Sequence, residues 1–148
     1  MVLFNLYSNI KCELISREAF SRRKHADNID FTRIDFGMRF RDLKVGTSSI
    51  VANAGSHVTV HYTAHTLHGR LVDDSHTCFS SGISFIAGES GLVPPVLHRG
   101  VLGMSLGTRR EIIAPPAAHF PEQFPRDILI YEINLVKVGK VFSNFSKI

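Results

Sequence analysis

The sequence has no long run of apolar residues: none approaches the roughly 20 that a membrane-spanning helix requires. It has no tryptophan and only two cysteines, Cys12 and Cys78, which show neither CxxC spacing nor a disulfide framework. We therefore expect a soluble or at most peripheral chain without a membrane span, whose cysteines are reduced and structural. All six prolines lie between Pro94 and Pro125, which places the rigid loops in the second half of the chain.

A strong charge of one sign is also missing. The net charge is only +4, and the basic residues are scattered apart from Arg22-Arg23-Lys24 and Arg109-Arg110. Aromatic and basic residues do not interleave, and no helix-turn-helix spacing is present, so we expect no nucleic-acid binding. With 44% hydrophobic and 20% charged residues, the 148 residues have the balance of one globular domain with a real core.

The sequence also lacks a pattern of metal ligands. His57, His61 and His65 alternate along one strand pattern, and neighbours four residues apart are separated by about 13 Å in a strand. Consecutive pairs are therefore too far apart to bind one ion tightly, and we expect no metal site and no cofactor. A solvent-facing surface that responds to pH is the simpler explanation for these histidines.

The chain divides into three segments. Residues 1–34 have no clean period and are interpreted as an N-terminal extension, helical or loosely ordered, with a targeting segment as the alternative. The apolar opening is short, and Glu13 and Glu18 count against an organellar transit peptide. Residues 35–140 form the folded domain and 141–148 a short tail. The compartment stays open, with the cytoplasm favoured over an organelle.

The domain reads as strands around one helix. The clearest alternation runs from His57 to Thr66, and further strand patterns cover 35–46, 70–74, 83–87 and 127–138. A helical pattern from Val96 to Met104 gives way, after a glycine-rich turn, to a strand that begins at Arg109 and ends before two prolines. One short helix against an antiparallel sheet indicates an α+β domain.

Four motifs occur in a recognisable order: Val60-His61-Tyr62-Thr63, Gly69 followed by Asp73 and Ser75, Leu102-Gly103-Met104 with Gly107 and Arg109-Arg110, and the strand from Leu129 to Val138. Together they resemble the FKBP-type peptidyl-prolyl isomerases, over a span from about Phe40 to Val138. The resemblance implies a bent antiparallel β-sheet wrapped around one short α-helix. It also implies an active groove between helix and sheet.

The resemblance assigns the residues of this groove by position. Tyr62 and Asp73 are retained as catalytic residues, and Asp73 is expected to be a half-buried carboxylate that accepts a hydrogen bond from Tyr62. Phe120 aligns with a catalytic tyrosine whose hydroxyl contacts the substrate. The implied substrate-binding residues are Val72, Ile83, Val93, Pro94, Leu97 and Tyr131.

Several of these positions depart from the family pattern. Val72 and Ile83 stand where the family usually has phenylalanine, and Leu97 stands where it often has tryptophan. Spacing alone would make Tyr62, Leu97 and Tyr131 packing residues, so only the resemblance assigns them to a groove. The connection from residue 120 to the last strand is also short, whereas the family has a longer loop that walls the groove.

The implied function is peptidyl-prolyl cis/trans isomerisation of X-Pro bonds in protein or peptide substrates, with weak activity. The alternative is a catalytically degenerate module of the same fold that binds a protein partner through the groove. Tyr62 and Asp73 favour the enzyme, whereas the aliphatic substitutions and the short loop favour the binding module. For the same reason we expect the macrolide ligands of the family to bind poorly, if at all.

Overall fold

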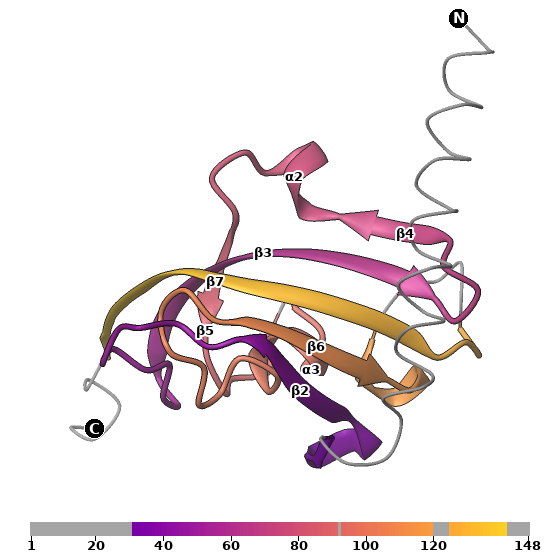
Figure 1. Ribbon diagram of the computed structural model, residues 1–148, viewed down its shortest axis with the longest axis horizontal. Helices are drawn as coiled ribbons and strands as arrows, with labels where there is room; N and C mark the ends of the chain where they lie inside the picture. The colour runs from indigo at the N-terminus through magenta and orange to yellow at the C-terminus, as the bar shows by residue number, and fades with distance from the viewer. Residues whose placement is uncertain (1–30, 92, 120–124, 142–148) are drawn as a thin grey trace, which may run out of the picture.

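The structure is a computed structural model that describes residues 31–91, 93–119 and 125–141 (Figure 1). Its strands are β1 (Thr32–Arg33), β2 (Arg39–Lys44), β3 (Ser56–Thr66), β4 (Leu71–Asp74), β5 (Ile83–Ile86), β6 (Arg109–Ala114) and β7 (Leu129–Val141). The helical segments are short: the 3-10 turns η1 (Asp35–Gly37) and η2 (Pro116–Ala118), and the α-helices α2 (Ser75–Cys78) and α3 (Pro95–His98).

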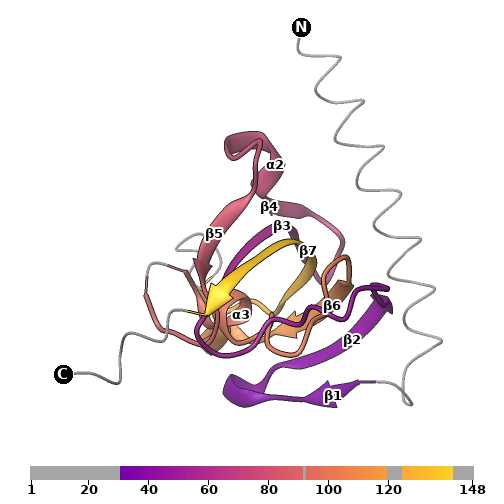
Figure 2. The ribbon, with the colours of Figure 1, turned by 90° about the vertical axis from the view of Figure 1, so that its left-hand side faces the viewer.

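All the strands pair antiparallel in one sheet, in the order β1-β2-β6-β7-β3-β4. One edge of β3 pairs with β7 along its length, and the opposite edge is shared between β5 at residues 57–60 and β4 at residues 63–65. Figure 2 shows the sheet curving around α3. The predicted α+β fold, a bent antiparallel sheet around one short helix, is confirmed.

The core lies on the inner side of this curve. In β3 the residues Val58, Val60, Tyr62 and Ala64 are buried, whereas the residues between them are partly exposed, as the alternating pattern predicts. Helix α3 adds Val96 and Leu97 to the same cluster. The apolar positions of the predicted helix and strands lead us to expect one shared core, and nine such residues all belong to this cluster: Val58, Val60, Tyr62, Leu97, Val101, Ile112, Leu129, Ile133 and Leu135.

Helix α3 is shorter than its sequence pattern predicted. Pro95 occupies its first turn, where a missing N–H is harmless, but the helix ends at His98 instead of continuing to Met104. Gly100 follows at a point where a Cβ would overlap the Val96 carbonyl oxygen and Ile112 Cδ1, so the chain passes directly against β6. Gly103 then adopts φ +81°, a left-handed conformation that ends the helical path.

Arg110 joins three parts of the domain. From β6 its Nε and Nη2 donate to the Asp42 carboxylate of β2 at 2.7 and 3.2 Å. Its Nη1 donates to the carbonyls of Gly100 and Leu102, at 3.0 and 2.9 Å, in the turn after α3. The guanidinium also lies 4.0 Å from the centre of the Phe40 ring. One buried side chain therefore fixes the end of α3 to the sheet.

Some elements were not predicted. β1 is a two-residue strand that pairs with β2, and it lies in the segment assigned to the extension; residues 1–30 and 142–148 lie outside the described residues. α2 occupies a stretch predicted as loop, and it begins where the Asp74 carboxylate accepts the His76 N–H at 2.9 Å. Within the described ranges we find no helix with the length and apolar character needed to cross a bilayer.

Candidate active site

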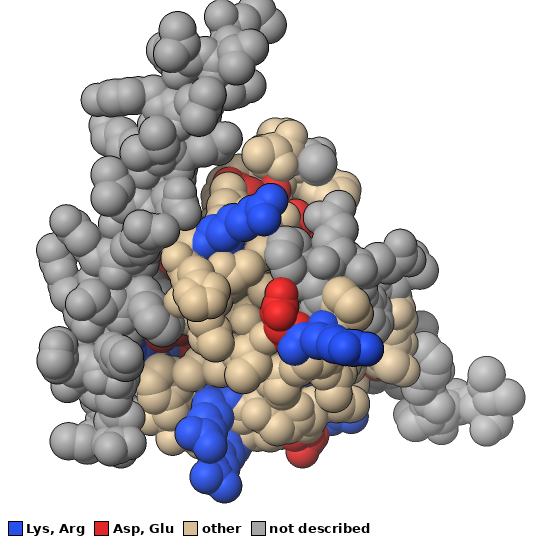
Figure 3. Space-filling model, turned by 90° about the vertical axis from the view of Figure 1, so that its right-hand side faces the viewer, with Lys and Arg blue, Asp and Glu red and all other residues tan. Residues whose placement is uncertain are grey.

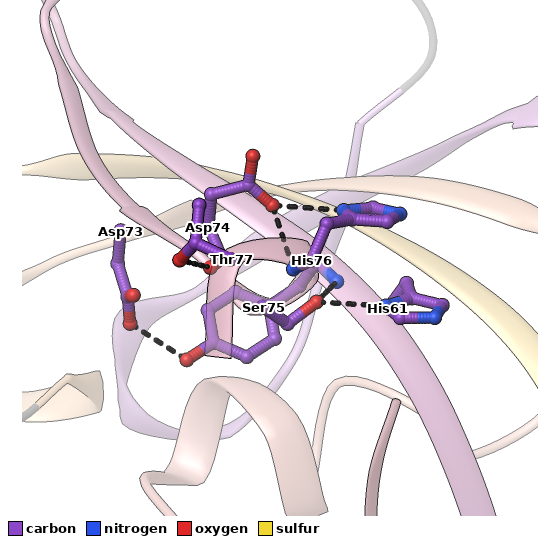
Figure 4. A network of polar contacts seen from close by, with 7 residues as sticks. His61, Asp73, Asp74, Ser75, His76 and Thr77 are labelled. Atoms are coloured by element: carbon purple, nitrogen blue, oxygen red, sulfur yellow. Dashed lines mark hydrogen bonds and ion pairs between the residues drawn. The ribbon is translucent and has the colours of Figure 1, made fainter. Parts of the chain in front are cut away.

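A short hydrogen bond joins the two retained catalytic candidates. Tyr62 on β3 donates its hydroxyl to Asp73 Oδ2 on β4, with 2.6 Å between the oxygens (Figure 4). This length is typical of a hydroxyl bonded to an ionised carboxylate. The register brings the pair together, because Asp73 lies opposite Ala64, two residues from Tyr62 on the same face of β3. The predicted hydrogen bond is therefore present, although Asp73 is exposed rather than half-buried.

The ring of Tyr131 lies beside the ring of Tyr62. Its ring centre lies 5.7 Å from that of Tyr62, with the two planes tilted by 32°. Burial raises the pKa of the Tyr131 hydroxyl, and the negative charge of Asp73 raises it further. Tyr131 is therefore a neutral phenol at physiological pH, and the nearby Asp73 carboxylate disfavours its ionisation.

Aliphatic side chains from three other elements pack against the core cluster to which both tyrosines belong. Val72 on β4, Ile83 on β5 and Val93 before α3 are partly buried and pack against the core cluster. Leu97 is only 1% exposed, so it is a core residue that offers little surface of its own. Pro94 is partly exposed and caps α3 at its N-terminal end.

Val93 also lines a hollow of about 250 Å³ beside β5. Phe85 lines it from the strand, and Glu89 and Gly91 line it from the following loop. Phe85 is a buried member of the core cluster that the sequence analysis did not assign to the site. The sequence could have identified Phe85, because it lies two residues after Ile83 and therefore on the same face of β5.

The third catalytic candidate, Phe120, lies outside the described residues, so its predicted place in the site stays a prediction. The residue before it is fixed: His119 is buried, and its Nε2 donates to the Asp127 carbonyl at 2.7 Å. This bond joins the two ends of the connection that carries Phe120. Because a carbonyl oxygen can only accept, Nε2 must carry a proton.

Ser75 is the second site residue that the sequence analysis did not single out as functional. It is 1% exposed, and its Oγ accepts the backbone N–H of Tyr62 at 2.8 Å. No periodic signal marks such a contact, because it joins a side chain to a backbone group 13 residues away. In the part of the chain that the structure describes, no three His, Cys, Asp or Glu side chains gather as metal ligands.

Comparison with known proteins gives a match to one protein family. The model of the FKBP-type peptidyl-prolyl cis-trans isomerase family matches residues 48–136. The chloroplastic peptidyl-prolyl cis-trans isomerase FKBP19 of Arabidopsis thaliana is 32% identical over 104 residues, which cover 63% of this chain and 40% of that protein. The 46 kDa FK506-binding nuclear protein of Spodoptera frugiperda is 31% identical over 109 residues, or 69% of this chain and 26% of that protein.

Solved structures agree on the fold. FkpA from Escherichia coli superposes with a TM-score of 0.63 at 18% identity, covering 91% of this chain and 62% of that one. AtFKBP13 superposes with a TM-score of 0.61 at 20% identity, covering 75% of this chain and all of that one. The curated relatives are longer, and the matched part of this chain spans less than half of their length.

Proposed function

Because the chain belongs to the FKBP-type peptidyl-prolyl cis-trans isomerase family, we propose that it catalyses cis/trans isomerisation of X-Pro bonds in protein or peptide substrates. The observation that carries the proposal is the Tyr62–Asp73 hydrogen bond, set beside the Tyr131 ring and among aliphatic side chains. The polar pair and the apolar surroundings are the two properties that this reaction needs in one place.

The reaction breaks no covalent bond. An X-Pro bond rotates across a barrier of roughly 18–20 kcal/mol, because amide resonance is lost as the bond twists. A site that prefers the twisted amide over both planar forms lowers this barrier, and about 4 kcal/mol of preference gives a thousandfold rate. Neither a nucleophile nor a metal is required for such a mechanism.

Each part of the site has a role in this proposal. Val72, Ile83 and Val93 contact the proline ring and exclude water from the amide, whose planar form is the one that water stabilises best. Leu97 and Tyr131 support the proline ring from below, and Pro94 shapes the rim. Tyr62 and Asp73 form the polar end, which orients the substrate relative to the apolar walls.

The experiment is a proline-limited refolding assay with the wild type and Asp73→Asn. We expect Asp73→Asn to lower kcat/KM about tenfold, because it replaces a hydrogen bond to a charged group, worth about 1.5–3 kcal/mol, by a neutral one, worth about 0.5–1.5 kcal/mol. The exposed Asp127 provides a matched control, and Asp127→Asn should leave the rate unchanged. Equal rates for the wild type and Asp73→Asn would exclude Asp73 from catalysis.

A binding module is the second candidate function, and the aliphatic walls favour it. Leu97 is almost fully buried and smaller than an aromatic residue, so it would give less contact to a proline ring. If the wild type is inactive while a protein partner binds and protects the partly exposed Val72 and Ile83, the chain is a binding module. Weak binding of macrolide ligands is proposed in either case, because their aromatic contacts are reduced.

A further inference from the structure

The central strand β3 lacks a strand partner at one point on the edge that faces β4 and β5. β5 pairs with residues 57–60 of β3, and β4 pairs with residues 63–65. The residues between these stretches are His61 and Tyr62, and both contact Ser75 at the start of α2 instead. Figure 4 shows the contact between His61 and Ser75. A buried backbone N–H without an acceptor is strongly unfavourable, so this gap needs another hydrogen-bond partner.

Ser75 supplies that partner. Its Oγ accepts the Tyr62 N–H at 2.8 Å, in the place that a carbonyl oxygen of a neighbouring strand would otherwise take. The side chain is buried, and it is the first residue of α2, directly after β4 ends. Where the pairing of β3 with β4 ends, the hydrogen bond from the Tyr62 N–H to Ser75 Oγ therefore replaces a strand-to-strand hydrogen bond.

The position of Ser75 is itself fixed by its neighbours. Asp74 accepts the His76 N–H at 2.9 Å and contacts His76 Nδ1 at 2.8 Å, and Thr77 Oγ1 donates to the Asp74 carbonyl. Burial disfavours a charged Asp74, but the hydrogen bonds and charge of His76 outweigh this and lower the pKa of its carboxyl. The cap therefore stays ionised and bonded at neutral pH.

A stacked pair of histidine rings closes this network from the other side. His61 and His76 are 4.0 Å apart between ring centres, with planes within 7° of parallel, and His61 Nδ1 lies 3.1 Å from Ser75 Oγ (Figure 4). The Ser75 hydroxyl thus contacts both the β3 backbone and a ring that packs on the same turn. These contacts restrict the Ser75 side chain to one position, from which it can fix the position of a neighbouring residue.

The junction of β4 and α2 holds both ends of Tyr62. Ser75 binds its backbone N–H, and Asp73, two residues earlier, accepts its hydroxyl. We propose that Ser75 is a positioning residue of the site: by fixing the Tyr62 backbone it sets where the Tyr62 hydroxyl meets Asp73 and the substrate. The inference rests on the proposed isomerase function, but the position of Tyr62 can be measured without any activity.

The first experiment follows Tyr62 by NMR in Ser75→Ala, with Ser81→Ala as the control because Ser81 is an exposed serine of the same connection. We expect faster hydrogen exchange at the Tyr62 amide and shifted Tyr62 ring resonances in Ser75→Ala only. Ser75→Thr, which restores the hydroxyl, should return both signals toward the wild type. Unchanged ring resonances in a folded Ser75→Ala protein with a fast-exchanging amide would overturn the proposal.

The second experiment measures kcat/KM on an X-Pro peptide at a temperature where every variant is folded. We expect Ser75→Ala to lose about tenfold, since small displacements of positioned groups cost up to about a hundredfold. In a Tyr62→Phe background the loss should shrink, because part of it acts through the absent hydroxyl. A purely structural role would give the same factor in both backgrounds, and that result would contradict the proposal.

The two hypotheses can fail separately. If the wild type is inactive, the proposed isomerase function fails, and the NMR signals of Tyr62 decide the role of Ser75. If the wild type is active and Ser75→Ala keeps the same kcat/KM, the isomerase function stands and the positioning role is wrong.

Discussion

At the scale of single residues, the buried side chain of His98 should make the stability of the domain depend on pH. His98 is 3% exposed at the end of α3, and its Nδ1 has no hydrogen-bond partner among the described residues. Its burial lowers the pKa of the imidazole, and the neighbouring charge of Arg99 lowers it further. The folded state therefore favours the neutral ring, whereas the unfolded chain binds a proton at the ordinary value near 6.5.

This difference predicts a loss of stability in weak acid. Above pH 6.5 both states are neutral at His98, so it contributes no pH dependence. As the pH falls below that value, the unfolded state gains a proton that the folded state resists, and the free energy of unfolding falls by up to about 1.4 kcal/mol per pH unit. Urea unfolding at pH 7.5 and 5.5 should show a smaller decrease for His98→Leu than for the wild type. Equal decreases would assign the pH dependence to other groups.

Phe120 carries the prediction that bears most directly on catalysis. The family resemblance aligns Phe120 with a tyrosine, and a neutral hydrogen bond from such a hydroxyl is worth about 0.5–1.5 kcal/mol. We expect Phe120→Tyr to raise the rate of a proline-limited refolding reaction roughly two- to twelvefold. Phe79→Tyr, at a phenylalanine that is 51% exposed outside the site, serves as the control. No gain from Phe120→Tyr in an active protein would mean that residue 120 does not reach the substrate.

At the scale of elements, the contact between α3 and β6 depends on a missing side chain. Gly100 lets the chain after α3 pass against Ile112 and leaves the Gly100 carbonyl to accept from Arg110. The short helix is therefore held by the sheet rather than by its own four residues, which would not be stable as an isolated helix.

Gly100→Ala should accordingly destabilise the domain. The added methyl group would overlap the Val96 carbonyl and Ile112, and overpacking of this kind costs about 1–3 kcal/mol. Gly91→Ala is the matched control, because nothing lies within 4 Å of a Cβ at Gly91. Chemical denaturation of both variants measures the difference, and similar stabilities would show that α3 can shift without cost.

At the scale of the whole molecule, alternation along the strands was sufficient to predict most of the fold. The period of two in β3 identified its buried face, and the parity of β7 placed Ile133 and Leu135 in the same core. The Tyr62–Asp73 bond was predicted by resemblance to a family, since spacing alone would have left Tyr62 as a packing residue.

Other features carry no local signal in the sequence. Arg110 pairs with Asp42 across 68 positions, and Ser75 meets a backbone group, so neither contact follows from a period or a motif. α2 is four residues long, too short for helical periodicity to appear. The described basic side chains also form no local pattern on the face drawn in Figure 3, where Lys and Arg are spread apart rather than gathered into one stripe.

The His119–Asp127 bond has a consequence for engineering. Because it joins residues on either side of the connection that carries Phe120, the anchors of that connection are defined independently of its length. Doubling the length of a flexible loop costs only about 0.6 kcal/mol in closure entropy. The domain should therefore accept a longer loop from a relative between these anchors, and the chimera would test whether such a loop adds the groove wall that the family resemblance implies.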